Sequence, residues 1–265
     1  MYLTIINDCH DPLTMNRQIV RAATLFPGLH ISPVAVGNYA DLEASGVIID
    51  TLDAALGKPG IIFANVAPRH GKAKKWPNGT PFGHIQIGET HLFTTVDGAT
   101  LSLVNKYGLA ENVEVYDLPT VISAQIKAGK LDATLESYIV NTQFRSYEFL
   151  PRVARWYLDG DKLPFETHAL RDFLPAPLAV WYIDNFGNCK TTAWATDFAH
   201  VPGDKIRTKW GEITCYKSLK DVPNGETGLT IGSSGLGDRR FVEFVIQGKS
   251  AANAYQVKVG DQLFD

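Results

Sequence analysis

Hydrophobic residues in the first part of the chain alternate between short continuous runs and runs at helical spacing. Apolar residues recur with the period of an amphipathic helix at 14–25 and 41–56, and a further helix fits 147–158. The continuous runs are typical of strands, and they occupy residues 2–6, 31–36, 61–66 and 113–116. This βαβα order predicts an α/β domain with a mostly parallel sheet and helices on both faces.

The pattern changes after Gly160, where residues 161–177 are rich in proline and charge and are interpreted as a linker. Short apolar runs separated by turn sequences follow, at 178–183, 205–216, 228–231 and 240–246. Strands at this spacing predict a small β-barrel or sandwich. We therefore divide the chain into domains of residues 1–165 and 166–265.

Composition narrows the classes of function. The chain has 265 residues and a net charge of −3, without the basic face that nucleic-acid binding needs. No apolar stretch is long enough for a membrane span, and no signal-peptide pattern follows Met1, so we expect a cytoplasmic protein. Three widely spaced cysteines and seven scattered histidines include no zinc-binding pattern, and we expect no metal.

Asp8, His10 and Asp11 follow the first predicted strand. Ligands of open α/β sheets bind at the carboxyl ends of strands, so these side chains are candidates for a site. Two carboxylates there can accept hydrogen bonds from a ribose diol or hold a hard cation through oxygen ligands. Asp also stabilises ordinary turns by bonding its own backbone, and the sequence leaves the three interpretations open.

A second candidate is the turn Ile183-Asp184-Asn185-Phe186-Gly187-Asn188, which ends an apolar run. An aromatic face can stack on a purine while Asn and Asp bond polar ligand atoms, although a plain inter-strand turn has the same composition. The glycine-rich stretch 232–237 lacks the order and the following helix of a dinucleotide site, and we expect a loop there.

Taken in order, several segments resemble the family of S-adenosylmethionine hydroxide adenosyltransferases, fluorinases and chlorinases. The segments are Asn7-Asp8-Cys9-His10 with Asp11-Pro12, residues 96–104 (Val-Asp-Gly-Ala-Thr-Leu-Ser-Leu-Val), the turn at 183–188, and residues 241–245 followed by Gly248, 250–252 and Gly260-Asp261. The turn at 183–188 and the C-terminal segment carry the resemblance most specifically.

The resemblance implies an α/β domain joined to a C-terminal β-barrel, in a homotrimer that binds S-adenosylmethionine between one subunit's N-terminal domain and its neighbour's C-terminal domain. It implies that Asp8 bonds the ribose hydroxyls and that Asp11 lies near the methionine end. The remaining implied ligand residues, which would surround the nucleoside, are Asp184, Phe186, Asn188, Glu243 and Ile246.

The catalytic residues of the family's hydrolases do not carry over. Ala67 stands at the family's Asp, Lys74 or Lys75 at its Arg, and Arg145 at its His. Ser146 falls where the halogenases place a halide-binding serine. Arg145 with Lys74 can form a positive pocket for an anion, or Arg145 can pair with Glu148 one helical turn later.

We therefore expect an enzyme that displaces methionine from the ribose 5′ carbon of S-adenosylmethionine, its substrate, with water or an anion and without a cofactor. A sulfonium leaving group needs no acid, so alignment of the nucleophile is the main task. Two alternatives are a catalytically silent protein that binds S-adenosylmethionine or adenosine, and a nucleoside hydrolase-like calcium enzyme.

Overall fold

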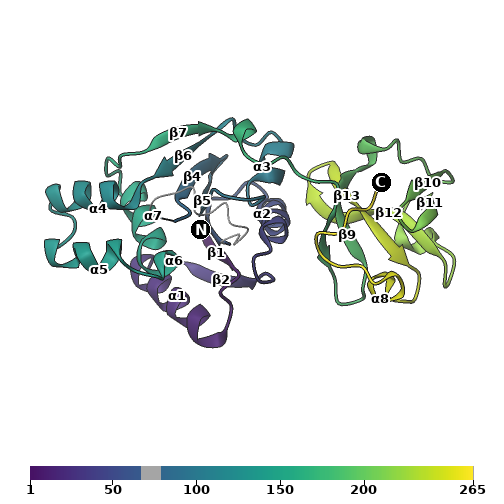
Figure 1. Cartoon of the computed structure of the whole chain (residues 1–265), viewed down its shortest axis with the longest axis horizontal. Helices are drawn as coiled ribbons and strands as arrows, with labels where there is room; N and C mark the ends of the chain where they lie inside the picture. Colours follow the sequence, from purple (N-terminus) through teal and green to yellow (C-terminus); the bar gives the residue numbers. More distant parts are fainter. Residues whose placement is uncertain (67–78, 265) are drawn as a thin grey trace. The chain divides into compact units, whose positions relative to one another are not determined.

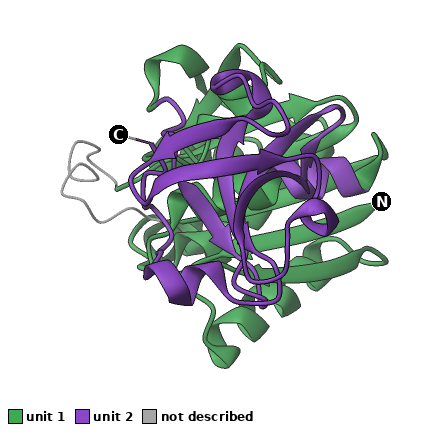
Figure 2. Cartoon of the chain, turned by 90° about the vertical axis from the view of Figure 1, so that its right-hand side faces the viewer, with its two compact units in different colours: residues 1–48, 55–174 green, residues 49–54, 175–265 purple. Residues whose placement is uncertain are grey.

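The computed structural model describes residues 1–66 and 79–264. The chain divides into two compact units, which Figure 2 distinguishes by colour. The first contains Met1–Ile48 and Ala55–Leu174, and the second contains Ile49–Ala54 and Pro175–Asp265. Each unit has a sheet of its own, so each is described separately.

A seven-stranded sheet of order β2-β1-β3-β5-β4-β6-β7 forms the centre of the first unit. Its strands are β1 (Tyr2–Asn7), β2 (His30–Ala35), β3 (Gly60–Asn65), β4 (Phe82–Ile87), β5 (Thr90–Thr95), β6 (Asn112–Tyr116) and β7 (Glu166–Ala169). β7 lies beyond residue 165, where we expected the domain boundary, and it pairs with β6.

This sheet is mixed, and the prediction of a mostly parallel sheet was wrong. β1 pairs in parallel with β2 and β3, and β3 pairs in parallel with β5. β4 runs antiparallel to both β5 and β6, and β6 runs antiparallel to β7. The physical reason is the connection between β4 and β5, since Gly88 and Glu89 make a tight turn whereas a parallel pair needs a long crossover.

Helices cover both faces of the sheet, with α1 and α4–α7 on one side and α2 and α3 on the other (Figure 1). Their bounds are α1 (Pro12–Leu25), α2 (Asp41–Ala55), α3 (Ser102–Lys106), α4 (Leu118–Lys127), α5 (Glu136–Val140), α6 (Arg145–Glu148) and α7 (Leu150–Leu158). The core on the α1 side combines Leu3, Ile5 and Phe63 of the sheet with Ala22 of α1 and Val153 of α7.

The predicted single helix at 147–158 is divided in the structure. α6 ends at Glu148, and α7 begins at Leu150 with Pro151 in its first turn. Proline has no backbone N–H and a fixed φ, so it suits the first turn of a helix and not its interior. α6 is therefore a separate one-turn helix, and it carries Arg145 and Ser146.

A six-stranded sheet of order β10-β11-β12-β13-β9-β8 forms the second unit. Its elements are β8 (Val180–Ile183), β9 (Cys189–Trp194), β10 (Lys205–Thr208), β11 (Gly211–Tyr216), β12 (Thr227–Leu236), β13 (Arg239–Ile246) and α8 (Ala251–Tyr255). β11 and β12 are parallel, and the other neighbours are antiparallel. This strand order does not by itself show the expected closed barrel.

The expected loop at 232–237 is largely strand. Residues 232–236 belong to β12, whose pairing with β13 shifts register between Ile231 and Gly235. A β-bulge of this kind places extra residues in one strand and bends it, which explains why small residues gather there.

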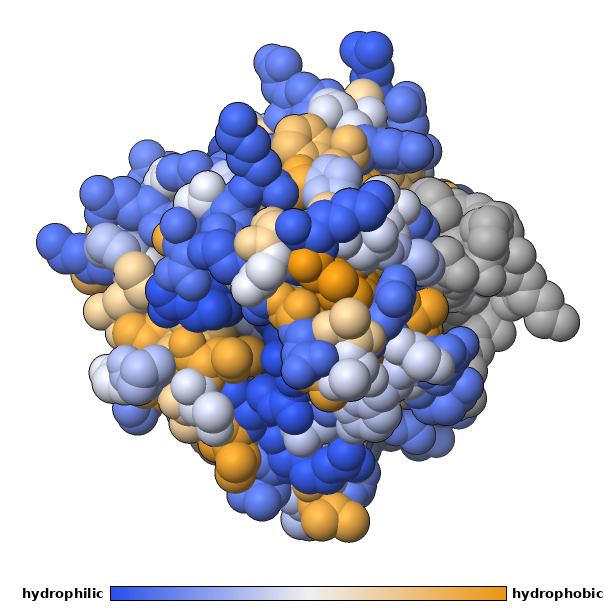
Figure 3. Space-filling view, turned by 90° about the vertical axis from the view of Figure 1, so that its left-hand side faces the viewer, coloured by the Kyte–Doolittle hydropathy of each residue, from blue (hydrophilic) through white to orange (hydrophobic). Residues whose placement is uncertain are grey.

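The end of the first unit that carries α4 and α5 is mostly hydrophilic, with smaller hydrophobic areas among the polar side chains (Figure 3). Tyr138 on α5 is 56% exposed, and Leu13 and Val20 on α1 are also exposed. Scattered apolar side chains of this kind are ordinary on a protein surface.

Polar side chains around the buried His84 connect three strands of the first sheet. His84 on β4 is 3% exposed, and its Nδ1 lies 3.1 Å from Oε2 of Glu114 while its Nε2 lies 3.1 Å from Nδ1 of His91. The Tyr116 hydroxyl donates to the same Glu114 oxygen at 3.1 Å, and Tyr157 packs against the His84 ring. Burial lowers the pKa of His84 to about 4, despite the opposing effect of Glu114.

Stability should therefore fall as the pH drops from 6.5 to about 4. In this window the unfolded chain protonates His84 while the folded chain resists doing so, and the difference amounts to up to about 3 kcal/mol. Urea unfolding at a series of pH values measures the slope. His84→Gln, which cannot titrate, should flatten that slope, and an unchanged slope in this variant contradicts the assignment.

Candidate functional site

A cavity of about 270 Å³ lies at the carboxyl ends of the parallel strands of the first unit. Asp8 follows β1, Asn65 ends β3 and Thr95 ends β5, so the sheet itself brings these polar side chains to one edge. Arg145 and Ser146 of α6 form another part of its wall. Cys9, Asn38, Tyr39, Thr80, Phe82, Gln143 and Phe144 complete the described lining.

The loop after β1 is held by a buried amide. Asn7 is fully buried, and its Oδ1 accepts hydrogen bonds from the Cys9 backbone N–H at 3.0 Å and from Nδ2 of Asn65 at 2.9 Å. The Asp8 backbone N–H in turn donates to the Asn65 carbonyl. Oδ2 of Asp8 accepts from the Tyr39 backbone N–H at 3.2 Å. The position of Asp8 in the cavity wall is therefore fixed by backbone contacts on both sides.

Asp11 lies in a neighbouring open hollow of about 450 Å³, which Asp8 also lines. It is the N-cap of α1, and its Oδ1 accepts from the Thr14 backbone N–H at 2.9 Å. Hydrogen bonds from Thr14 lower the pKa of Asp11, so its carboxylate is ionised at neutral pH. The structure thus gives Asp11 a capping role, alongside a position beside the candidate site.

Arg145 and Ser146 both face the cavity. Ser146 is 7% exposed, whereas Arg145 is half-buried and burial lowers the pKa of its guanidinium. A cation in such surroundings has lost part of its hydration, so it gains more from an anion than a surface arginine does. Lys74, the predicted companion of Arg145, lies outside the described residues.

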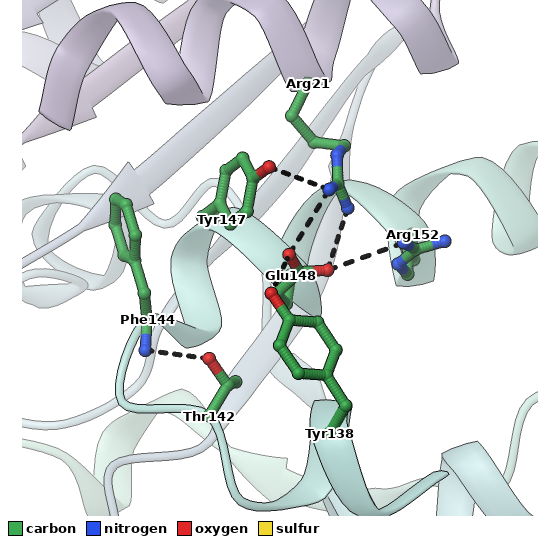
Figure 4. Close-up of polar contacts among 7 residues, drawn as sticks. All are labelled: Arg21, Tyr138, Thr142, Phe144, Tyr147, Glu148 and Arg152. Carbon is green, nitrogen blue, oxygen red and sulfur yellow. Dashed lines mark hydrogen bonds and ion pairs between the residues drawn. The ribbon is translucent and has the colours of Figure 1, made fainter. Parts of the chain in front are cut away.

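A buried carboxylate fixes α6 in place (Figure 4). Glu148 has a 2% exposed side chain, and its Oε2 lies 2.8 Å from Nη1 of Arg21 on α1 and 3.4 Å from Nη2 of Arg152 on α7. Tyr138 of α5 donates to its Oε1 at 3.0 Å, and Arg21 also donates to the Tyr147 hydroxyl at 2.8 Å. Burial alone raises the pKa of Glu148, but Arg21, Tyr138 and Arg152 lower it overall.

This network corrects one alternative from the sequence. The helical spacing allowed Arg145 to pair with Glu148, but Glu148 is bound instead by Arg21 and Arg152. Arg145 lines the cavity instead. Aromatic contacts add to this arrangement. The ring centroids of Phe144 and Tyr147 lie 5.3 Å apart in a stacked geometry, and the Arg17 guanidinium lies over both rings.

The second unit carries the turn that sequence analysis singled out. Oδ1 of Asp184 accepts from the backbone N–H groups of Phe186 and Asn188, each at 2.9 Å, and its Oδ2 accepts from Nδ2 of Asn188 at 3.0 Å. Asp184 therefore organises the turn, and the Phe186 ring is left 71% exposed. Gly187 has φ +81°, and a Cβ there would overlap Ser250.

Glu243 and Ile246 lie on β13 with different surroundings. Glu243 faces Lys190 of β9, and its side chain covers Gly232, where any Cβ would overlap the carboxylate. Burial raises the pKa of Glu243. Ile246 is 6% exposed and belongs to the core of the second unit, so its side chain serves packing.

The structure thus assembles two groups of predicted residues. Asp8, Arg145 and Ser146 line one cavity, with Asp11 in the adjoining hollow, while Asp184, Phe186 and Asn188 share one turn. Several contributors to the cavity were not predicted from the sequence, among them Asn65 and Thr95. Asn65 ends a run that was recognised as a strand, so its position was a usable signal.

Residues 178–264 match the family model of the SAM hydroxide adenosyltransferase C-terminal domain. This part of the chain is similar to that domain family, and the resemblance inferred from the sequence is confirmed there. The matched residues include the Asp184 turn and the strand with Glu243. The comparison with curated proteins gave no match.

Two solved structures are similar along nearly the whole chain. An uncharacterized conserved protein from Thermotoga maritima is 17% identical, with 98% of each chain covered and a TM-score of 0.68. A conserved hypothetical protein from Thermus thermophilus is also 17% identical, with 99% of this chain and 97% of that chain covered and a TM-score of 0.62. At this identity the likeness shows the fold alone.

Two absences concern the described residues only. Within 1–66 and 79–264, no three or more His, Cys, Asp or Glu side chains are grouped so that they could hold a metal ion. No helix in the same ranges combines the length and the apolar character that crossing a membrane requires.

Replacing Glu148 by glutamine should destabilise the first unit by about 3 kcal/mol. The change leaves the partly buried guanidinium groups of Arg21 and Arg152 without their carboxylate. Asp159→Asn is the matched control, because Asp159 pairs with Arg155 at an exposed position and should cost less than about 1 kcal/mol. Urea unfolding of both variants gives the comparison, and equal losses contradict a central role for Glu148.

Gly187→Ala should destabilise the second unit more than Gly225→Ala. Both glycines have φ near +80°, so each substitution carries a backbone penalty of about 1 kcal/mol. Only at Gly187 does the added Cβ meet another residue, Ser250, whereas nothing lies within 4 Å at Gly225. Thermal unfolding of the two variants measures the difference. If Gly225→Ala proves as harmful, the contact with Ser250 is unimportant.

Proposed function

We propose that this protein binds S-adenosylmethionine and displaces methionine from the ribose 5′ carbon with water or a small anion. The observation that carries the proposal is the match of residues 178–264 to the SAM hydroxide adenosyltransferase C-terminal domain. It is supported by a cavity in the first unit that holds Asp8, Arg145 and Ser146. On the family resemblance we also propose that the C-terminal unit forms a closed barrel and that the protein is a homotrimer whose sites are shared between subunits.

Each candidate residue has a task that its chemistry suits. Asp8 accepts hydrogen bonds from the ribose hydroxyls, while the exposed Phe186 ring offers a stacking face for the adenine. Asn188 and Glu243 supply polar contacts to the nucleoside, and Asp11 lies toward the methionine end. Ser146 donates its hydroxyl to the incoming nucleophile.

The reaction needs no acid for its leaving group. The nucleophile forms a bond to C5′ as the C5′–sulfur bond breaks, and the electron pair of that bond returns to sulfur, so methionine leaves as a neutral thioether. With an anion as nucleophile the charges cancel and no proton moves. With water, one proton must pass to solvent or to a base in the course of the step.

Arg145 favours an anion over water. A guanidinium remains protonated at neutral pH and cannot accept a proton from water, but it can hold an anion. The substrate sulfonium is itself a cation, and two cations in one cavity repel each other. An anion that lies between Arg145 and the sulfonium removes this repulsion, and it is then placed for attack on C5′.

The second candidate function is binding of S-adenosylmethionine or adenosine without turnover. Ala67 and Arg145 favour it, because they stand where the family's hydrolases carry an Asp and a His. The two functions share the nucleoside-binding residues and differ only in the fate of the ligand, so one experiment separates them.

The experiment is mass spectrometry of the purified protein incubated with S-adenosylmethionine, alone and with chloride, fluoride, formate or acetate. We expect a 5′-substituted adenosine with at least one anion, and less adenosine with water alone. Intact S-adenosylmethionine in every sample, with binding shown by calorimetry, supports the silent binding protein. Absence of binding of both S-adenosylmethionine and adenosine at millimolar concentration overturns both.

Asp8→Asn should weaken adenosine binding at least tenfold, because the hydrogen bonds to the ribose lose their ionic acceptor. Asn keeps an oxygen for the Tyr39 backbone N–H, so the loop keeps its contact. Asp132→Asn is the control, since Asp132 is an exposed carboxylate that accepts from a backbone N–H outside the cavity. Calorimetry with adenosine compares the two, and equal affinity in the Asp8 variant removes Asp8 from the site.

A further inference from the structure

A second cavity in the first unit, of about 360 Å³, lies beside the candidate site and is not used by the proposed function. It is formed by the start of β4, the end of β6, the first turn of α4 and the residues before β7. Most of its wall is apolar, and the side chains that provide this surface are Pro81, Phe82, Val115, Leu118, Phe149 and Phe165. A cavity of this size and character suits a small organic ligand.

Arg145 is the cationic group in the described wall, and it lines the first cavity as well. Its guanidinium packs directly against Gly79, where an added Cβ would lie 2.6 Å from Nη2. The glycine therefore makes room for the guanidinium between the two cavities. Partial burial removes water from the guanidinium, and this strengthens its interaction with an anion in either cavity.

The acidic groups that border the cavity do not compete for the same position. Asp117 caps α4, where its Oδ2 accepts from the backbone N–H of Thr120 at 3.1 Å and from its hydroxyl at 2.5 Å. The Glu166 side chain is 84% exposed and lies 3.4 Å from His168. Both carboxylates are thus engaged or hydrated, and the described interior offers apolar contacts and the Arg145 guanidinium.

We propose that this cavity binds a small carboxylic acid with an apolar body, whose carboxylate bonds Arg145 while its hydrocarbon part packs on Phe82 and Phe149. Two hydrogen bonds from a guanidinium match the geometry of a carboxylate, and burial of a hydrocarbon body against the apolar wall is favourable. A neutral molecule of the same shape lacks the ionic contact, and a short acid lacks the apolar one.

Three probes test this inference on the wild-type protein in the absence of any nucleoside: hexanoate, 1-hexanol and acetate. Calorimetry should show hexanoate binding at least tenfold more tightly than either of the other two. In a methyl-labelled sample, hexanoate should shift the resonances of Val115 and Leu118. If 1-hexanol binds as tightly as hexanoate, or if the shifts occur elsewhere, the proposal is overturned whatever the outcome for S-adenosylmethionine.

Two variants separate the ionic and the apolar contribution. Arg145→Gln should reduce hexanoate affinity at least tenfold and leave 1-hexanol affinity unchanged, whereas Phe165→Ala should weaken both ligands. Phe165 is 49% exposed, so its removal does not disturb the core. Arg207→Gln, at an exposed position of β10, is the matched control and should change neither affinity. Undiminished hexanoate binding by a folded Arg145→Gln variant overturns the proposal.

Discussion

The carboxylate of Glu148 is the interaction on which the candidate site depends. It joins α6 to Arg21 of α1, Tyr138 of α5 and Arg152 of α7, so four helices meet at one buried charge. A buried carboxylate is expensive to desolvate, and several donors are needed to offset that penalty. Because α6 has only one turn, it cannot hold its own direction, and the network supplies what the helix lacks. Ser146 is positioned as a consequence.

Much of the fold follows from local patterns, and the departures have a common cause. The runs at 2–6, 31–36 and 61–66 became β1, β2 and β3 within a residue of the expected bounds. The hairpin of β4 and β5 was missed, because polar residues such as His84 and His91 interrupt its apolar pattern. His84 is buried and contacts Glu114 on a third strand as well as His91, and a pairing across strands leaves no periodic signal.

Residues of the candidate site could be predicted where they lie next to a recognisable strand or turn in the sequence. Asp8 was found because a polar loop after the first strand of an α/β sheet faces the ligand edge, and Asp184 because its turn is compact in sequence. Thr95 was missed together with β5. Glu148 was noticed only as a neighbour of Arg145 in a helix, whereas its main partner, Arg21, lies 127 residues away. Sequence spacing points only to partners nearby in the chain, whereas the partners of a buried charge are set by the tertiary structure.

Arg145 links the two cavities and decides what the first can do. On the family resemblance, Arg145 stands where the hydrolases carry a His, and its guanidinium can hold an anion but cannot deprotonate water. Gly79 has no side chain and so leaves space for the Arg145 guanidinium. The neighbouring Ser146 is buried and lines the first cavity too. In the proposed function, the sulfonium of the substrate would meet a charge of its own sign at Arg145, and an anion between the two would remove this repulsion. If the proposed reaction takes place at this site, its acceleration would come from the placement of charge, because alignment and desolvation of the nucleophile are the effects that remain without a base.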